Sequence, residues 1–179
     1  MSEAGSRRAL LVIDMQAGLF HGPDRPYEGQ RVLDNINQLI AKAHQAQAPV
    51  FAVRHTGPAG SPIAPDSPLT RLLPELALDL DSDQVIEKTR PSCFAGTDLA
   101  GRLRKAAVNE LVIVGMKTEF CVDTTCRAAA ELGFKVWLVE DAHTTMHTPV
   151  LQADAIIAHH NRTLNGPFVQ GVVTSKCEF

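Results

Sequence analysis

The sequence predicts an α/β fold in which helices cover both faces of a parallel sheet. Short apolar runs rich in β-branched residues alternate with helical patterns along the 179 residues. Most of these runs are continuously apolar, which is typical of parallel strands buried on both faces. The length fits one domain, and no repeat of roughly 20 to 50 residues is present. We therefore expect a single domain over residues 1–179, with residues 1–7 as a flexible tail.

Six apolar runs are the candidate strands, and the third is the weakest. They cover residues 9–13, 50–53, 83–87, 111–114, 136–139 and 168–173. Between the first two runs an amphipathic helix is predicted from apolar residues at helical spacing, namely Val32, Ile36, Leu39, Ile40 and Ala43. Pro49 is expected to end this helix before the second strand begins.

The later helices have recognisable starts and ends. Thr97 and Asp98 supply an N-cap and a first-turn acid for the helix after the third strand. Gly133 is expected to end the next helix. Thr148 and Pro149 predict the start of the last helix, with proline in the first helical position.

Composition excludes several classes of protein. Seventeen Lys and Arg residues against twenty Asp and Glu residues give a formal charge of -3 without a basic run, so no nucleic-acid partner is expected. No segment approaches the ~20 apolar residues that span a bilayer, and the run 9–13 is too short for a signal-peptide core. We expect a cytoplasmic protein without membrane contact. The proline-rich stretch 58–74 is expected to be a long surface loop, a lid or a subunit contact.

Metal ligands are not expected among the cysteines and histidines. The four cysteines are widely spaced, which predicts free thiols, at Cys93, Cys121, Cys126 and Cys177. Four residues separate Cys121 from Cys126, whereas zinc-binding pairs are commonly closer. His143 and His147 are four residues apart, a spacing that would place both on one face of a helix. We expect a loop there instead, so the spacing does not predict a pair of metal ligands.

The strand ends carry the candidate chemistry, because ligands of open parallel sheets bind beyond the carboxyl ends of the strands. The residues at these ends are Asp14, His55, Lys88, Cys121 and Asp141. A strand-to-helix turn precedes Cys121, so its thiol pKa is expected to fall below the ordinary value of about 8.5. Asp14 could accept the thiol proton while Lys88 keeps the carboxyl charged, which makes Cys121 a candidate nucleophile. The alternatives are a buried apolar cysteine, a surface lysine and an aspartate that caps a turn.

Well-known phosphate-binding and nucleophile motifs are absent from the sequence. No G-x-G-x-x-G follows the first strand and no G-x-x-x-x-G-K-[ST] occurs, which disfavours dinucleotide and P-loop sites. The absence of G-x-S-x-G disfavours a nucleophilic serine. No cofactor is expected.

Three stretches in order resemble the signature stretches of the isochorismatase-like cysteine hydrolases. They are Leu11-Val12-Ile13-Asp14-Met15-Gln16, then Glu87-Lys88 with Ser92-x-Phe94 and Thr97-x-Leu99, then Val114-Gly115-x-x-Thr118-Glu119-x-Cys121-Val122. The resemblance covers nearly the whole chain, as far as residues 155–174. It implies a three-layer α/β/α domain with a six-stranded parallel Rossmann-like sheet.

The resemblance also implies a site. Its triad would be Asp14, Lys88 and Cys121, with a cis peptide bond between Met116 and Lys117 and an oxyanion hole made by the amides of Lys117 and Cys121. Members of the family hydrolyse small amides, ureas and carbamoyl compounds, and commonly form homo-oligomers. Nicotinamidase-like proteins bind a metal through an aspartate and histidines, but Val53 stands in place of that aspartate here, so no metal is expected.

The expected function is cysteine-dependent hydrolysis of a C–N bond in a small molecule through a thioester intermediate. Vinyl-ether hydrolysis and a non-catalytic binding or oligomerisation module are the alternatives. The candidate substrate-binding residues are Gln16, Phe20, His55, Lys117, Glu119 and His143. With Arg90, Lys117 indicates either an acidic substrate or a charge that faces solvent, and Glu119 is expected to play a supporting role.

Overall fold

The computed structural model describes residues 6–179, in which strands and helices alternate as the sequence predicts. The strands are β1 Arg8–Ile13, β2 Val50–His55, β3 Gln84–Lys88, β4 Glu110–Met116, β5 Lys135–Thr144 and β6 Gln170–Val172. The α-helices are α1 Ala17–Phe20, α2 Gly29–Gln45, α3 Leu99–Lys105, α4 Asp123–Glu131 and α5 Ala153–Leu164. Short helical turns cover Pro68–Thr70, Thr118–Val122 and Thr174–Lys176.

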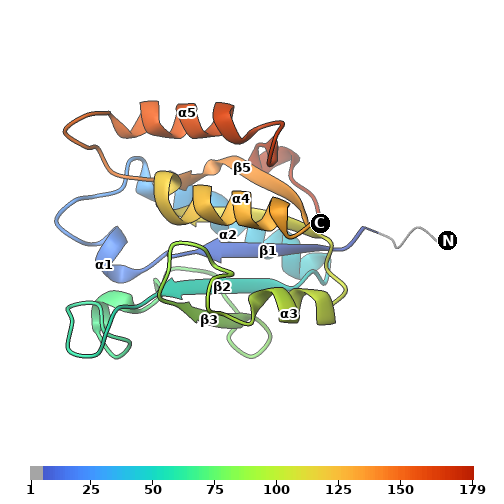
Figure 1. Cartoon of the computed structure of the whole chain (residues 1–179), viewed down its shortest axis with the longest axis horizontal. Helices are drawn as coiled ribbons and strands as arrows, with labels where there is room; N and C mark the ends of the chain where they lie inside the picture. Colours follow the sequence, from blue (N-terminus) through green and yellow to red (C-terminus); the bar gives the residue numbers. More distant parts are fainter. Residues whose placement is uncertain (1–5) are drawn as a thin grey trace.

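The six strands form one parallel sheet in the order β3-β2-β1-β4-β5-β6. The chain moves outward from β1 through β2 to β3 and then returns to β4 beside β1. The strand order therefore reverses between β1 and β4, which is where open α/β sheets bind ligands. Figure 1 shows β1 and β2 running toward the same end of the molecule. The predicted fold class and sheet are confirmed.

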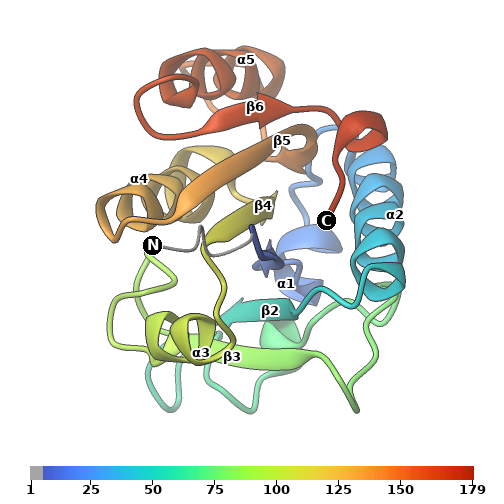
Figure 2. The same ribbon diagram turned by 90° about the vertical axis from the view of Figure 1, so that its right-hand side faces the viewer.

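Two apolar cores lie on the two faces of the sheet. Alternate residues of β1 divide between them, so that Leu10 and Val12 pack on the α2 side and Leu11 and Ile13 on the side of α3 and α4. Figure 2 shows α2 on one side of the sheet and α3 and α4 on the other. The predicted apolar face of α2 is buried at every position, which confirms the helical pattern.

Glycine at position 115 allows β4 to approach β1 closely. A Cβ atom at Gly115 would lie 2.1 Å from the carbonyl oxygen of Ile13, and the backbone φ is +119°. Both facts favour glycine, since its missing side chain removes the clash and the conformational penalty. The pairing of β4 with β5 shifts register between Ile113 and Gly115, and Gly115 then pairs with His143.

Several predicted boundaries are wrong. Strand β5 continues through Asp141 and His143, so Asp141 does not follow the strand and His143 is not in a loop. Helix α5 begins at Ala153, because Thr148 caps a tight turn by accepting the N–H of Leu151 at 2.9 Å. These boundaries depend on strand pairing and on side-chain hydrogen bonds, which the pattern of apolar residues does not predict.

Residues 6 and 7 of the expected tail are described in the structure. Residues 1–5 of the expected tail lie outside the described residues. The backbone N–H of Arg7 donates to Asn109 Oδ1 at 2.8 Å. Arg7 is therefore held against the residue that precedes β4. Within residues 6–179, no helix combines the length and apolarity that a bilayer crossing requires.

Candidate active site

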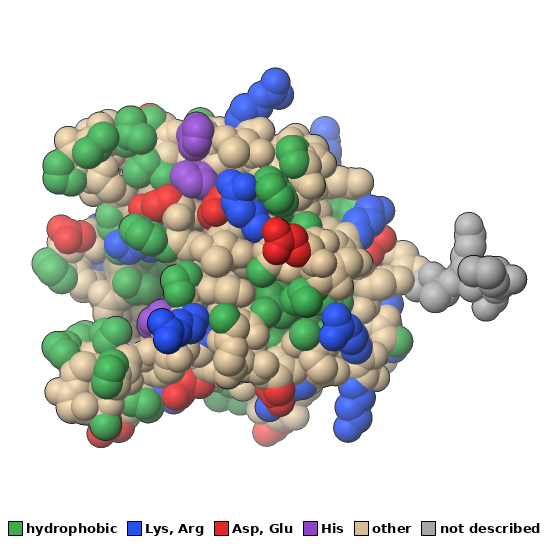
Figure 3. Space-filling model, viewed as in Figure 1, with side chains coloured by type: hydrophobic (Ala, Val, Ile, Leu, Met, Phe, Trp, Pro, Cys, Tyr) green, Lys and Arg blue, Asp and Glu red, His purple; other side chains and the backbone are tan. Residues whose placement is uncertain are grey.

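A cavity of about 270 Å³ opens at the carboxyl ends of β1, β2 and β4. Its lining residues are Asp14, Gln16, Gly18, Leu19, His55, Ile63, Leu69, Thr70, Lys117, Phe120 and Cys121. Figure 3 shows apolar side chains gathered on the lobes at this end of the molecule. Three of the five predicted strand-end residues, Asp14, His55 and Cys121, therefore line a cavity with apolar walls, whereas Lys88 and Asp141 do not line it.

The Lys88 ammonium group joins three functional side chains. Its Nζ lies 2.8 Å from Asp14 Oδ2, 3.0 Å from His55 Nδ1 and 3.2 Å from Cys121 Sγ. An ammonium group has only three protons, so each proton has one acceptor. His55 Nδ1 must accept, which places the proton of the neutral ring on Nε2. Burial, followed by the Lys88 charge, lowers the pKa of His55 and favours this neutral form.

The second carboxylate oxygen of Asp14 is free to act. Asp14 Oδ1 is buried without a hydrogen-bond partner in the described part of the chain, while Oδ2 is held by Lys88. One donor atom from each of Asp14, His55 and Cys121 lies within 4.8 Å of the others. Such a group could hold a metal ion, but the Lys88 ammonium group already contacts all three residues. A lone pair for a proton is therefore present beside the Cys121 thiol.

The predicted lowering of the Cys121 pKa is wrong. Burial, followed by the negative charge of Asp14, raises the pKa of this thiol to about 12. Burial also raises the pKa of the Asp14 carboxyl group, despite the opposing charge of Lys88. Cys121 lies inside the turn Thr118–Val122 that precedes α4 and is only 9% exposed, so desolvation outweighs the helix dipole. The thiol is protonated at neutral pH.

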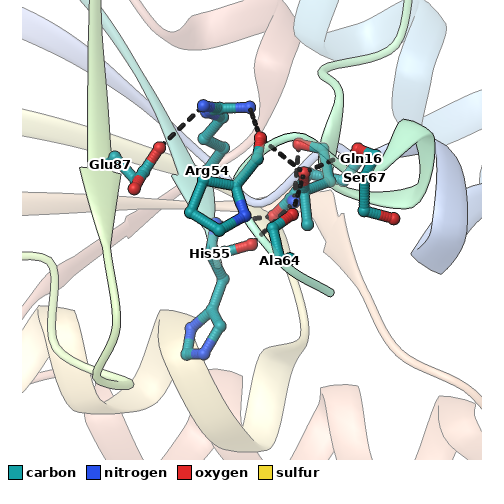
Figure 4. A network of polar contacts seen from close by, with 8 residues as sticks. Gln16, Arg54, His55, Ala64, Ser67 and Glu87 are labelled. Carbon is teal, nitrogen blue, oxygen red and sulfur yellow. Dashed lines mark hydrogen bonds and ion pairs between the residues drawn. The ribbon is translucent and has the colours of Figure 1, made fainter. Parts of the chain in front are cut away.

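Gln16 holds the cavity wall through its side-chain amide. Its Oε1 accepts the backbone N–H of His55 at 2.7 Å, and its Nε2 donates to the carbonyls of His55 and Thr70, each at 2.9 Å. Arg54 adds bonds to the Pro65 carbonyl and to Glu87. Figure 4 shows these contacts and the His55 ring pointing away from them. Gln16 therefore positions the wall, and its amide groups are already engaged.

Three of the predicted substrate-binding residues do not line the cavity. Phe20 is buried in the core on the α2 side, because α1 turns its ring inward. Glu119 Oε1 accepts from Thr145 Oγ1 at 2.9 Å, and His143 is buried behind the turn that carries Cys121. Arg90 is exposed and also outside the lining.

The segments that form the cavity walls could be predicted from the sequence as the loops 15–30 and 56–82, but the individual wall residues could not. Ile63, Leu69 and Thr70 come from the proline-rich segment, and Leu19 comes from α1. Their positions depend on backbone bonds such as Ala17 N–H to Arg71 O at 2.9 Å, which leave no local signal. Phe120 was the one detectable member, since it directly precedes Cys121.

A chain of hydrogen bonds supports the turn that carries Cys121. Asn161 Nδ2 donates to the Glu140 carbonyl at 3.2 Å, and its Oδ1 lies 2.7 Å from His143 Nε2. Because an amide oxygen only accepts, His143 Nε2 carries the proton and Nδ1 accepts from Thr118 Oγ1 at 2.8 Å. In its neutral form His143 therefore links Asn161 to Thr118 in the turn.

We expect His143 to make the protein less stable in acid. Burial lowers its pKa to about 4, whereas an unfolded histidine titrates near 6.5. The unfolded state therefore binds the proton first, and stability falls as the pH drops below about 6.5. Linkage predicts a loss of about 2 to 3 kcal/mol between pH 7 and pH 4.5. Urea unfolding at both pH values measures this loss.

His143→Gln should remove most of this pH dependence, while His159→Gln, on the exposed part of α5, should keep it. An unchanged difference between the two pH values in His143→Gln would contradict the assignment.

Comparison with known proteins identifies the family. The isochorismatase domain profile matches residues 8–163. A streptothricin hydrolase of Streptomyces noursei is 38% identical over 145 residues, which are 79% of this chain and 51% of the relative. Nicotinamidase 3 of Arabidopsis thaliana is 30% identical over 158 residues, or 81% and 77% of the two chains. The crystal structure of an isochorismatase family protein superposes with a TM-score of 0.87 at 35% identity, covering 92% of this chain and 97% of that one.

The chain belongs to the isochorismatase family, as the resemblance predicted. It spans about half the length of the streptothricin hydrolases, 51% and 56% of two such proteins. The peptide bond between Met116 and Lys117 is cis in the structure.

Proposed function

We propose that this protein is a cysteine-dependent hydrolase that cleaves a C–N bond of a small amide, urea or carbamoyl compound. The observation that carries the proposal is the free, buried Asp14 Oδ1 beside the Cys121 thiol, with Lys88 holding the other carboxylate oxygen. The names of two relatives, a streptothricin hydrolase and a nicotinamidase, support hydrolysis, and the second supports an amide substrate.

The first half of the proposed reaction forms a thioester. Asp14 Oδ1 accepts the thiol proton while Cys121 Sγ attacks the substrate carbonyl carbon. The raised pKa of Asp14 makes this carboxylate a stronger base than one in water, and Lys88 stabilises the thiolate as it forms. The backbone N–H groups of Lys117 and Cys121 bind the oxyanion. The C–N bond then breaks, and Asp14 returns its proton to the leaving nitrogen.

The second half consumes a water molecule. Asp14 accepts a proton from the water as its oxygen attacks the thioester carbonyl, and the same N–H groups bind the second oxyanion. The C–S bond breaks, an acid is released and the proton returns to Cys121. Each turnover therefore leaves Asp14 ionised and Cys121 protonated, as at the start.

Selective labelling of Cys121 and a trapped intermediate test this function. With limiting iodoacetamide from about pH 5 to 9, we expect peptide mass spectrometry to find Cys121 labelled before the other three cysteines, because it alone lines the cavity. Its labelling rate should still rise at pH 9, since the thiol pKa is about 12. A panel of small amides, including nicotinamide, should release ammonia or amine and leave an acyl mass on the Cys121 peptide after acid quenching.

Equal labelling of all four cysteines, or turnover with an acyl mass on another residue, would contradict the assignment. Labelling of Cys121 without turnover of any amide, urea or carbamoyl compound would favour a binding module.

A further inference from the structure

The charges that face the cavity do not cancel. Asp14 is the one carboxylate in the lining, and its charge is paired with the buried ammonium group of Lys88. His55 is held as a neutral ring by the same lysine. Because Lys117 also lines the cavity, the ionisable residues of the lining and Lys88 together carry one net positive charge.

The Lys117 ammonium group has no acidic partner among residues 6–179. The ion pairs of the described chain do not include it. Its Nζ lies 5.9 Å from the centroid of the Phe120 ring. Glu119 is close in sequence but its Oε1 bonds to Thr145, and it does not line the cavity. The cation is thus available to a ligand.

The remaining walls are apolar and partly open. Ile63, Leu69 and Phe120 are 43%, 46% and 53% exposed, which is high for large apolar side chains, and Leu19 completes the wall. Covering such surface with an apolar ligand is favourable by about 25 cal/mol for each Å² removed from water. The cavity of about 270 Å³ has room for a small organic molecule only.

We propose that Lys117 determines specificity by selecting substrates with an anionic group, whose apolar body lies against Leu19, Ile63, Leu69 and Phe120. The substrate class is then a small amide, urea or carbamoyl compound that also carries a carboxylate or a similar anion. This inference rests on the proposed function for the reacting group. The anionic subsite itself is a property of the cavity and can be tested without a substrate.

The test compares two alkylating reagents of similar size at Cys121, anionic iodoacetate and neutral iodoacetamide. The readout is the ratio of their labelling rates, measured by peptide mass spectrometry at pH 8. We expect Lys117→Gln to lower the ratio about tenfold, because a unit charge beside the anionic reagent contributes on that order in a partly solvated site. The ratio of the native protein should also fall with added salt. Lys105→Gln, at the exposed end of α3, is the matched control and should keep the ratio.

Protection of Cys121 from iodoacetamide tests the apolar wall with the same assay. Hexanoate should protect at a lower concentration than acetate, which lacks the apolar chain, or 1-hexanol, which lacks the negative charge. An unchanged ratio in Lys117→Gln, or equal protection by the three compounds, would overturn the proposed specificity while leaving the hydrolase standing. A failure of iodoacetamide itself to label Cys121 would instead overturn the proposed function.

Discussion

Replacing Cys121 with alanine is expected to lower kcat by at least about 10³-fold, because the group that forms the thioester is lost. The substitution removes one sulfur atom from a side chain at the cavity surface, so the fold should remain. Turnover of whichever amide the panel identifies measures the first effect, and urea unfolding measures the second. Cys121→Ser offers a nearly isosteric comparison, and we expect it to be almost as inactive because a serine hydroxyl is far harder to deprotonate.

Cys177→Ala is the matched control for this result. It also removes a thiol, but Cys177 lies in the core near the C-terminus and outside the cavity lining. It should therefore keep the native turnover. Native turnover in Cys121→Ala would remove the nucleophile from the proposed mechanism, and loss of turnover in Cys177→Ala alone would have the same meaning.

Breaking the Asp14–Lys88 pair is expected to affect both stability and activity. Both side chains are almost fully buried and their charged atoms are 2.8 Å apart. Lys88→Met leaves a buried carboxylate without its cation, and Asp14→Asn leaves a buried ammonium group without its anion. Each single variant should lose about 3 to 5 kcal/mol of unfolding free energy and nearly all turnover. Urea unfolding and amide hydrolysis measure the two losses.

The double variant Asp14→Asn/Lys88→Met separates the two roles. It removes both charges, so we expect the stability to recover by about 2 kcal/mol or more relative to the sum of the single losses, while turnover stays lost. In Lys88→Met the destabilisation should lessen as the pH falls, because the isolated carboxyl group of Asp14 takes up a proton more readily in the folded state. Additive stability losses, or native turnover in Asp14→Asn, would contradict the assigned roles.

The sequence alone determined the six strands, Lys88 and the three residues around its ammonium group. Continuous apolar runs identified the inner strands β1, β2, β4 and β5, since a strand buried on both faces has no polar side to alternate with. The edge strands β3 and β6 are less buried, and the run at β3 gave the weakest signal. Asp14, His55 and Lys88 could be predicted as neighbours because parallel strands bring their carboxyl ends to one edge. Cys121 was predicted from the turn that follows β4, and the family resemblance implied the same residue.

Only the tertiary structure decided the protonation pattern and the shape of the cavity. The bond from Lys88 to Asp14 spans 74 residues, and it determines which carboxylate oxygen is free and which nitrogen of His55 carries the proton. The direction of the Cys121 pKa shift was mistaken because desolvation depends on everything packed around the thiol, whereas the helix dipole could be predicted locally. The apolar walls likewise come from a loop held by distant backbone bonds. Periodicity along a chain reports neighbours in the same element, but burial and charge depend on atoms that meet only when the chain is folded.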